Sequence, residues 1–334
     1  MVHTAGLPLR SLLAALILQG AALFHATAAS AQMDAAAGYP KQPIKIVVGF
    51  AAGGGNDLIA RILAQKMGER LGQPAVVENK PGAGAVIGAE AVARAAPDGY
   101  TLLLAPPSTY SINPAVYAKL PYNPLTDYEY VAVVATYPFL LTVNAATPFK
   151  SVKELIDWSK ANPAKANYAS TSALFQLLTE LFKLRTGAPL EHIPFKGSNE
   201  MMTAILNGQV TMGFVDAAPL IGHVKAGKAR VLATSGTRRY ADMPDVPTLV
   251  EAGVPNVAVD GWSGVAAPKG TPSAIVSKLA AEFAAILALP DIKERFAALG
   301  VSPETSTPAE FRQLIEREGA LWKEVAKAAS IKLD

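Results

Sequence analysis

Three consecutive glycines, Gly53 to Gly55, form the stretch of this sequence best suited to holding a ligand. Glycine lacks a Cβ, so the turn can adopt unusual φ/ψ values and a ligand can approach its N–H groups closely. Asn56 or Asp57 is a natural N-cap for the helix that follows. Unpaired amides at a helix N-terminus favour an anion. The alternatives are that the glycines only make a tight strand–helix connection and that Asp57 only caps the helix.

Alternating strands and helices position this turn. Apolar runs of strand length precede glycine-rich or helical segments at residues 44–48, 75–78 and 100–105. This alternation predicts a parallel, doubly wound sheet, in which ligands bind at the carboxyl ends of the strands. The loop 106–111, with Ser108 and Thr109, leaves the third strand there and should face the same crevice as Gly53.

The rest of the chain predicts a second α/β unit and a return to the first. Strands are expected at 131–135 and 139–143, and alternation continues to a strand at 230–234. Residues 262–268 resemble a strand, and the last helix, 308–328, carries an apolar stripe that should pack back on a domain. We therefore predict two domains.

Composition excludes several classes of function. The chain has 334 residues, of which 51% are hydrophobic and 17% charged, with a formal net charge of +3. This composition is typical of a globular protein with a large core. The Lys and Arg residues are dispersed along the sequence, so there is no basic cluster of the kind that binds nucleic acid. The sequence contains no cysteine, which excludes disulfides, thiolate chemistry and Cys-ligated metals.

The N-terminus has the pattern of a secretory signal peptide. Arg10 precedes an apolar run over 12–23, and Ala29-Ser30-Ala31 provides a small-x-small cleavage site. We predict a cleaved leader over residues 1–31, with an uncleaved anchor as the alternative.

The sequence contains no recognisable set of catalytic residues. His192 and His223, the histidines outside the leader, are too few and too isolated for a metal site. There is no Gly-x-Ser-x-Gly elbow and no P-loop, and Leu58 stands where a dinucleotide fingerprint needs its third glycine. Glu78, placed where a ribose-binding acid would lie, is the best argument for an NAD enzyme, and export argues against it.

Several motifs, in order and spacing, resemble those of one family across the mature chain. They are Tyr39-Pro40, 49–54 (GFAAGG), 77–84 (VENKPGAG), 97–103 (PDGYTLL), 112–114 (INP), 194–198 (PFKGS), 225–228 (KAGK), 245–248 (DVPT), 251–253 (EAG) and 267–272 (APKGTP). The chain resembles the extracytoplasmic substrate-binding receptors of tripartite tricarboxylate transporters, the Bug family of bacterial periplasmic proteins.

The resemblance implies a two-lobed α/β periplasmic-binding-protein fold of type II, the Venus flytrap, with two crossover strands. Lobe 1 would comprise 39–142 plus 262–334 and lobe 2 would comprise 143–261, with the ligand cleft between them. It also implies a monomeric periplasmic receptor, without catalytic residues, metal or cofactor, that delivers a small carboxylate to large and small permease subunits. The alternatives are a receptor or sensor for an uncharged or amide ligand, and an exported α/β enzyme.

The same resemblance implies which residues contact the ligand. The first-lobe contacts would be Phe50, Ala51, Ala52, Gly53, Gly54, Gly55, Asn56, Asp57, Ser108 and Thr109. The second-lobe contacts would be Ser170, Thr171, Ser172, Lys196, Gly197 and Asp216.

Individual members of this set have competing interpretations. Lys196 could pair with a carboxylate, but Lys is seldom fully buried, so we predict that its ammonium is solvated. Asp216 could accept a hydrogen bond from a bound water or amine, or merely tie the following turn. Trp262 and Phe50 could wall an aromatic ligand, but we predict core or hinge packing for both.

Overall fold

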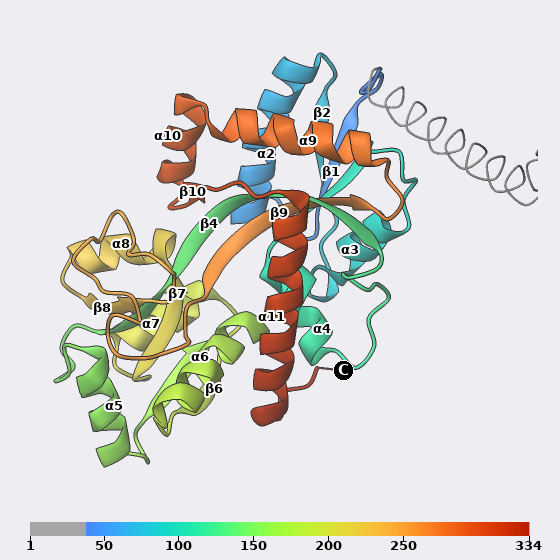
Figure 1. Ribbon diagram of the computed structural model, residues 1–334. Coiled ribbons are helices and arrows are strands. Elements are labelled where there is room, and N and C mark those ends of the chain that lie inside the picture. The colour runs from blue at the N-terminus through green and yellow to red at the C-terminus, as the bar shows by residue number, and fades with distance from the viewer. Residues whose placement is uncertain (1–37, 334) are drawn as a thin grey trace, which may run out of the picture.

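The computed structural model describes residues 38–333, which form two lobes, each a sheet covered by helices on both faces (Figure 1). The predicted leader, 1–31, lies outside the described residues. Within the described part of the chain, no single helix is both long and apolar enough to cross a membrane, although α9 and α10, bent by 77° where they meet, pass that test as a pair.

The first lobe contains the glycine turn. In chain order its elements begin with β1 (Ile44–Val48), α2 (Gly55–Leu71), β2 (Ala75–Asn79), η1 (Ala83–Ala85), α3 (Val86–Ala93), β3 (Thr101–Ala105), η2 (Ser108–Ile112) and α4 (Asn113–Val116). The lobe is completed by β9 (Asp260–Pro268), α9 (Ser273–Leu287), α10 (Pro290–Ala298), β10 (Ser302–Pro303) and α11 (Pro308–Ala328). The three predicted strand–helix units are confirmed, and β2, β1 and β3 are parallel neighbours.

The second lobe continues the predicted alternation. Its elements are α5 (Val152–Ala161), β5 (Asn167–Ser170), α6 (Ala173–Thr186), β6 (Glu191–Pro194), α7 (Ser198–Leu206), β7 (Met212–Asp216), α8 (Ala217–Lys225) and β8 (Ala229–Thr234). β5 is parallel to both β6 and β7, whereas β4 (Tyr128–Asn144) is antiparallel to β7 and β8. The predicted parallel arrangement is present in β1, β2 and β3 and in β5, β6 and β7, but both sheets are mixed, because β4 is antiparallel to β7, β8 and β9, and β9 is also antiparallel to β3.

One strand replaces the two that were predicted at 131–135 and 139–143. β4 runs unbroken through both segments, pairing with β9 as far as Pro138 and with β7 from Phe139. Pro138 lacks a backbone N–H but lies at the point where β4 changes neighbours, so little pairing is lost. Both predicted lobe boundaries, after residues 142 and 261, fall inside these two strands.

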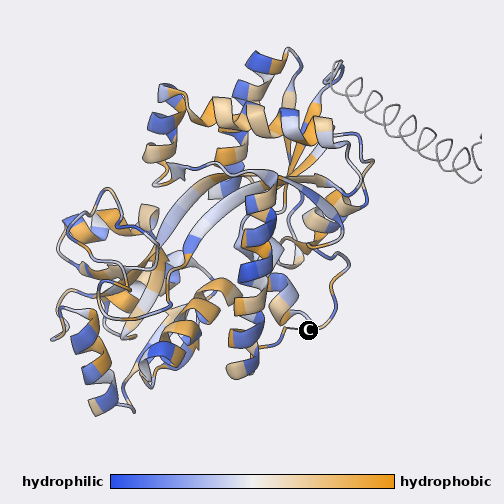
Figure 2. Ribbon diagram, in the orientation of Figure 1, coloured by the Kyte–Doolittle hydropathy of each residue, from blue (hydrophilic) through white to orange (hydrophobic). Residues whose placement is uncertain are grey.

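Apolar side chains fill both faces of each sheet. Figure 2 shows hydrophobic colours on the strands behind α9 and mixed colours on the helices that cover them. In the first lobe, one face packs against α2, α9 and α10, and the other holds an aromatic cluster in which Trp262 stacks on Tyr110 with ring centroids 5.9 Å apart. Trp262 is thus core packing, as the sequence predicted.

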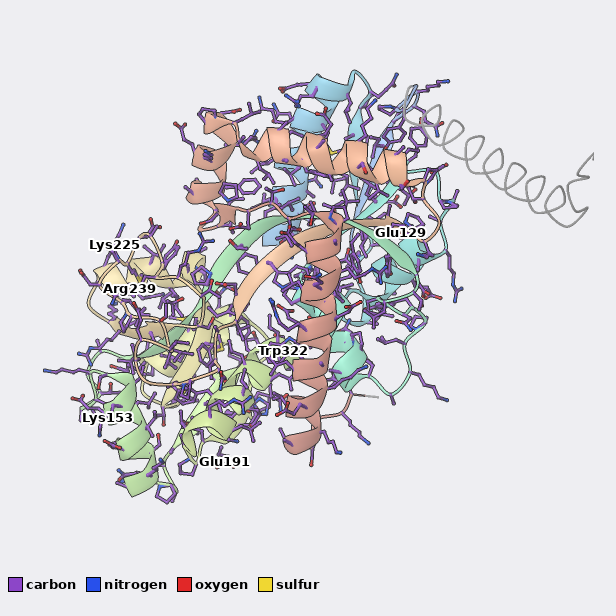
Figure 3. All side chains as sticks on the ribbon, in the orientation of Figure 1. Glu129, Lys153, Glu191, Lys225, Arg239 and Trp322 are labelled. Atoms are coloured by element: carbon purple, nitrogen blue, oxygen red, sulfur yellow. The ribbon has the colours of Figure 1, made fainter. Side chains whose placement is uncertain are left out.

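The last helix, α11, contacts both lobes along the predicted apolar stripe. Phe311 and Ile315 join the first-lobe aromatic cluster, whereas Trp322 and Val325 join a cluster made largely of second-lobe residues. Figure 3 places Trp322 where α11 faces the second lobe. A carboxyl, Glu318, lies within this stripe and is also buried.

Glu318 is held by hydrogen bonds from two other elements. Ser111 Oγ donates to Oε2 at 2.8 Å, and Trp262 Nε1 donates to Oε1 at 2.9 Å. Burial raises the pKa of Glu318 to about 7, although both hydrogen bonds and the nearby Arg317 guanidinium lower it. The folded protein therefore binds a proton here that the unfolded chain, with an ordinary pKa of 4.5, releases at lower pH.

This carboxyl should make stability depend on pH. Its folded-state pKa is raised, so its own contribution to stability is fully present below pH 4.5 and is lost as the pH rises through about 7. Glu318→Gln keeps an acceptor for Trp262 and removes the titration, so at pH 8 it should be more stable than the wild type by up to about 3 kcal/mol. Denaturant unfolding at pH 5 and pH 8 measures this difference.

The exposed Glu316→Gln on the same helix is the matched control and should change neither stability nor its slope with pH. A Glu318→Gln protein that is destabilised equally at both pH values would show that this carboxyl is not the titrating group.

Candidate functional site

A cavity of about 350 Å³ lies between the two lobes. Its lining comes from α2, β4, β9 and the segment after α10 on one side, and from α7, β7 and α8 on the other. The lining residues are Gly55, Asn56, Ile59, Tyr137, Ser198, Asp216, Ala217, Ala218, Pro219, Ser263, Leu299, Gly300 and Val301. Asp216 is the only one of these with a charged side chain.

The glycine turn brings the N-terminus of α2 to this cavity. Gly53 has φ 85°, a left-handed conformation that favours glycine, and Gly54 occupies the N-cap position without any side-chain cap. The amides of Gly55 and Asn56 therefore have no intrahelical partner. The prediction that Asn56 or Asp57 is the N-cap is wrong, because the helix begins at Gly55. The helix ends at Gly72, a C-cap in the left-handed conformation with φ 70°.

Asp57 stabilises the turn from inside the protein. Its buried carboxylate accepts hydrogen bonds from Gly53 N at 2.8 Å, Arg61 Nε at 2.9 Å and Asn79 Nδ2 at 2.9 Å. Burial alone would raise the pKa of Asp57, but these hydrogen bonds outweigh it and lower the pKa below its ordinary value. One glycine amide is thereby used within the protein, and those of the first helical turn are left for a ligand.

Asn56 is oriented by a residue far away in the sequence. Ser263 Oγ, on β9, donates to Asn56 Oδ1 at 2.7 Å. The Asn56 side-chain NH₂ group has no hydrogen-bond partner among the described residues, so it can donate into the cavity. This contact also connects α2 directly to a crossover strand.

Two second-lobe helices also begin at the cavity. α7 follows Gly197, and α8 follows Asp216, and neither N-cap residue makes a side-chain cap. Ser198, Ala217 and Ala218 line the cavity from these first turns. Three helix N-termini therefore converge on one cavity, and their free amides and dipoles favour a small anion.

Comparison with known proteins identifies this arrangement. Residues 59–331 match the profile of the tripartite tricarboxylate transporter family receptor. The chain belongs to this receptor family. It is 37% identical over 314 residues to Protein BugT of Bordetella pertussis, an alignment that covers 93% of this chain and 96% of that protein.

Solved structures of similar receptors share the fold. A structure titled as an R. palustris protein with adipate is 33% identical, has a TM-score of 0.75 and covers 88% of this chain and 99% of that one. MatC from Rhodopseudomonas palustris with bound malate is 31% identical, has a TM-score of 0.71 and covers 86% and 99%. The receptor family comprises periplasmic solute-binding proteins of transporters, which are not enzymes.

The carboxylate that suggested an NAD enzyme has partners within the protein. Glu78, the candidate ribose-binding acid, forms ion pairs with Lys45 at 2.7 Å and Lys80 at 3.0 Å. In residues 38–333, no three or more His, Asp or Glu side chains are grouped to hold a metal ion.

The first-lobe residues implied by the family resemblance lie in different places. Gly55 and Asn56 line the cavity, whereas the flanking turn, 51–54, is exposed and outside its lining. Thr109 is fully buried, with no hydrogen-bond partner for Oγ1, and Ser108 is partly exposed.

In the second lobe, Asp216 alone of the implied residues lines the cavity. Ser170 Oγ lies 2.7 Å from His192 Nε2, and Thr171 and Ser172 lie outside the lining. Lys196 is exposed, and Gly197 lies next to the lining residue Ser198. These assignments stay predictions for the bound receptor.

Sequence reasoning missed most of the cavity lining. Tyr137, Ser263 and the segment 299–301 were not candidates, because each belongs to an apolar strand or follows a helix without an unusual pattern. Ser198 could have been found, since it belongs to the motif 194–198 and stands beside the candidate Gly197.

Removal of the Asp57 carboxylate should destabilise the receptor. Asp57→Ala leaves Gly53, Arg61 and Asn79 without their acceptor. Removal of one partner from a buried, hydrogen-bonded ion pair costs about 3–5 kcal/mol, and a loss of this size is expected. The lowered pKa means that this stabilisation is present at neutral pH and is lost on acidification below an ordinary value of 3.8. Urea unfolding at pH 7 measures it.

The exposed Asp157, which pairs only with Lys153 on the surface, provides a control: Asp157→Ala should cost less than about 1 kcal/mol. Equal losses in the two variants would contradict the role assigned to Asp57.

Proposed function

We propose that this protein is a periplasmic receptor that captures a small organic acid between its lobes and delivers it to the large and small permease subunits of a tripartite tricarboxylate transporter. The observation that carries the proposal is the convergence of three uncapped helix N-termini on one cavity between the lobes. Relatives whose structures are titled with adipate and with bound malate support a carboxylate as the ligand.

The energetics favour binding by both lobes together. A hydrogen bond to a charged group contributes about 1.5–3 kcal/mol, so the α2 amides alone supply roughly 3–6 kcal/mol. Association costs about 4–15 kcal/mol, and over most of this range the cost exceeds what the α2 amides provide, so one lobe alone should bind a ligand weakly or not at all. Donors from α7 and α8 must therefore add to those from α2, and closure of the lobes becomes part of binding.

Uncharged hydrogen-bond donors cost the protein little when the cavity holds no ligand. None of the lining residues is Lys or Arg, so the empty cavity does not bury an unpaired cation. Amides are satisfied by water when the receptor is open and by the carboxylate when it is closed. This arrangement recognises a carboxylate group and leaves the choice of acid to the shape of the cleft.

Calorimetric titration tests the proposal. Purified mature protein, beginning at Gln32, is titrated at pH 7.5 with mono-, di- and tricarboxylates and with the matching amides. We expect at least one carboxylate to bind with a micromolar or lower Kd and its amide to bind at least tenfold more weakly. Tight binding of the amides, or turnover of any compound, would overturn it.

A substitution in the first turn of α2 tests the site. Gly55 lines the cavity, and a Cβ built there meets nothing within 4 Å, so Gly55→Leu should fold normally and gain up to about 1 kcal/mol of helix stability. Its side chain would occupy the space beside the amides and reduce affinity at least tenfold. Calorimetry and thermal unfolding measure the two effects.

Gly68→Ala, in the same helix but away from the cavity, is the control and should stabilise the protein without changing affinity. Unchanged affinity in Gly55→Leu would mean that the turn only connects a strand to a helix.

A further inference from the structure

A fully buried hydroxyl, Ser111 Oγ, faces two hydrogen-bond acceptors at once. It lies 2.8 Å from Glu318 Oε2 and 3.0 Å from the carbonyl oxygen of Pro107. A serine hydroxyl carries a single proton, so it can donate to one of these oxygens and not to both. When Glu318 is ionised, both partners of Ser111 are acceptors, and one of the two short contacts contains no hydrogen.

Protonation of Glu318 at Oε2 satisfies both contacts. The carboxyl O–H then donates to Ser111 Oγ, and Ser111 donates to Pro107. Oε1 remains a carbonyl oxygen and accepts from Trp262 Nε1 at 2.9 Å. All three contacts contain a hydrogen in this form, so the geometry favours the neutral acid. Burial acts in the same direction, because it raises the pKa of Glu318 to about 7.

The proton on Glu318 decides how the loop 106–112 is held. β3 and β1 are parallel neighbours, so this loop leaves the sheet at the edge where the glycine turn leads into α2. The loop carries Ser108, one of the expected ligand contacts. When Ser111 turns its proton toward an ionised Glu318, the loop loses the hydrogen bond from Ser111 to Pro107.

The charge of Glu318 also acts on the cavity between the lobes. Tyr137, which lines this cavity, donates to the carbonyl oxygen of Trp262, the residue whose indole contacts Glu318. Burial raises the pKa of Tyr137, and the charges of Asp216 and Glu318 raise it further. An ionised Glu318 therefore opposes an anion in the cavity, whereas the neutral acid does not.

Other ionisable groups surround this carboxyl. A second cavity, of about 410 Å³, borders Glu318, and its other ionisable lining residues are Asp260, Glu304, Glu310 and Arg317. The three carboxylates among them have protein partners of their own, and Arg317 lowers the pKa of Glu318. On η2 the ionisable group is Tyr110, whose hydroxyl donates to the carbonyl oxygen of Leu103. Within the described residues, no second carboxyl shares the hydrogen bonds of Glu318.

We propose that Glu318, as a neutral acid, is a positioning residue for the loop 106–112 and for β9, and that release of its proton weakens the capture of a carboxylate. This inference rests on the proposed receptor function. The sign follows from linkage: an anion binds more tightly to the protonated receptor, so affinity is highest below the pKa of Glu318 and falls as the pH rises through about 7.

Calorimetry between pH 6.5 and pH 8.5 tests this inference, with malate, adipate and butanoate as probes, because their carboxyl groups stay ionised over this range. The affinity of the wild type for its tightest probe should fall at least fivefold across the range. Glu318→Gln mimics the neutral acid, since its amide can accept from Trp262 and donate to Ser111. This variant should bind at pH 8.5 as tightly as the wild type binds at pH 6.5, within twofold.

Two control variants identify the titrating group. Glu316→Gln removes an exposed carboxyl from the same helix and should keep the wild-type pH profile. Asp216 is the competing source of a pH dependence, because it lines the cavity and burial raises its pKa to about 6. Asp216→Asn should retain the fivefold fall in affinity. Thermal unfolding at each pH verifies that every variant is folded.

A measurement without ligand supports the same assignment. The indole N–H resonance of Trp262 in an NMR spectrum should titrate with a midpoint near pH 7 in the wild type and stay constant in Glu318→Gln.

The outcomes separate the two proposals. A wild-type affinity that does not fall with pH, an indole resonance that does not titrate, or a fall in affinity that persists in Glu318→Gln overturns the role of Glu318 and leaves the carboxylate receptor standing. Binding of no carboxylate at any pH overturns both.

Discussion

A single pair of hydrogen-bonded strands joins the two lobes, and the rest of the structure depends on it. β4 and β9 pair from Tyr128 to Pro138, and their register shifts twice within this stretch. Such irregularities increase local twist and bending, and here they lie in the strand pair that leads from one lobe to the other. α11 lies against both lobes beside these strands (Figure 1), which confines any closure to motions that keep its apolar stripe covered.

Two buried carboxyls, Asp57 and Glu318, and one partly buried carboxyl, Asp216, show how the cost of removing a charge from water is met in different ways. Asp57 accepts three hydrogen bonds, so its charge is favoured and the glycine turn is fixed in place. Glu318 accepts two hydrogen bonds, and burial raises its pKa to about 7, so it is protonated more readily. Among residues 38–333, the Asp216 carboxylate accepts no hydrogen bond, and it lines the cavity. The three carboxyls have the same chemistry, and their environments give them different roles. Asp57 holds the glycine turn, Glu318 is packed in the core, and Asp216 is a candidate ligand contact.

Much of the fold was predictable because its signals are local. The strand, glycine turn and helix over residues 44–72 follow from apolar runs, from glycine and from a left-handed C-cap, all within one short segment. The order of β9 between β3 and β4 was not predictable, nor was the single long β4, because strand neighbours are chosen by contacts across the whole chain. For the same reason, Glu318 looked like one more polar residue on a long helix.

The sequence by itself determined that a helix N-terminus with free amides would follow the glycine turn, and it carried motifs that resemble one receptor family. Only the tertiary structure decided what faces that terminus. Ser263, which orients Asn56, is 207 residues away from it in the chain, and the first turns of α7 and α8 reach the cavity from the other lobe. Periodicity and composition report on neighbours within a few residues, whereas a cleft between lobes is formed by long-range packing.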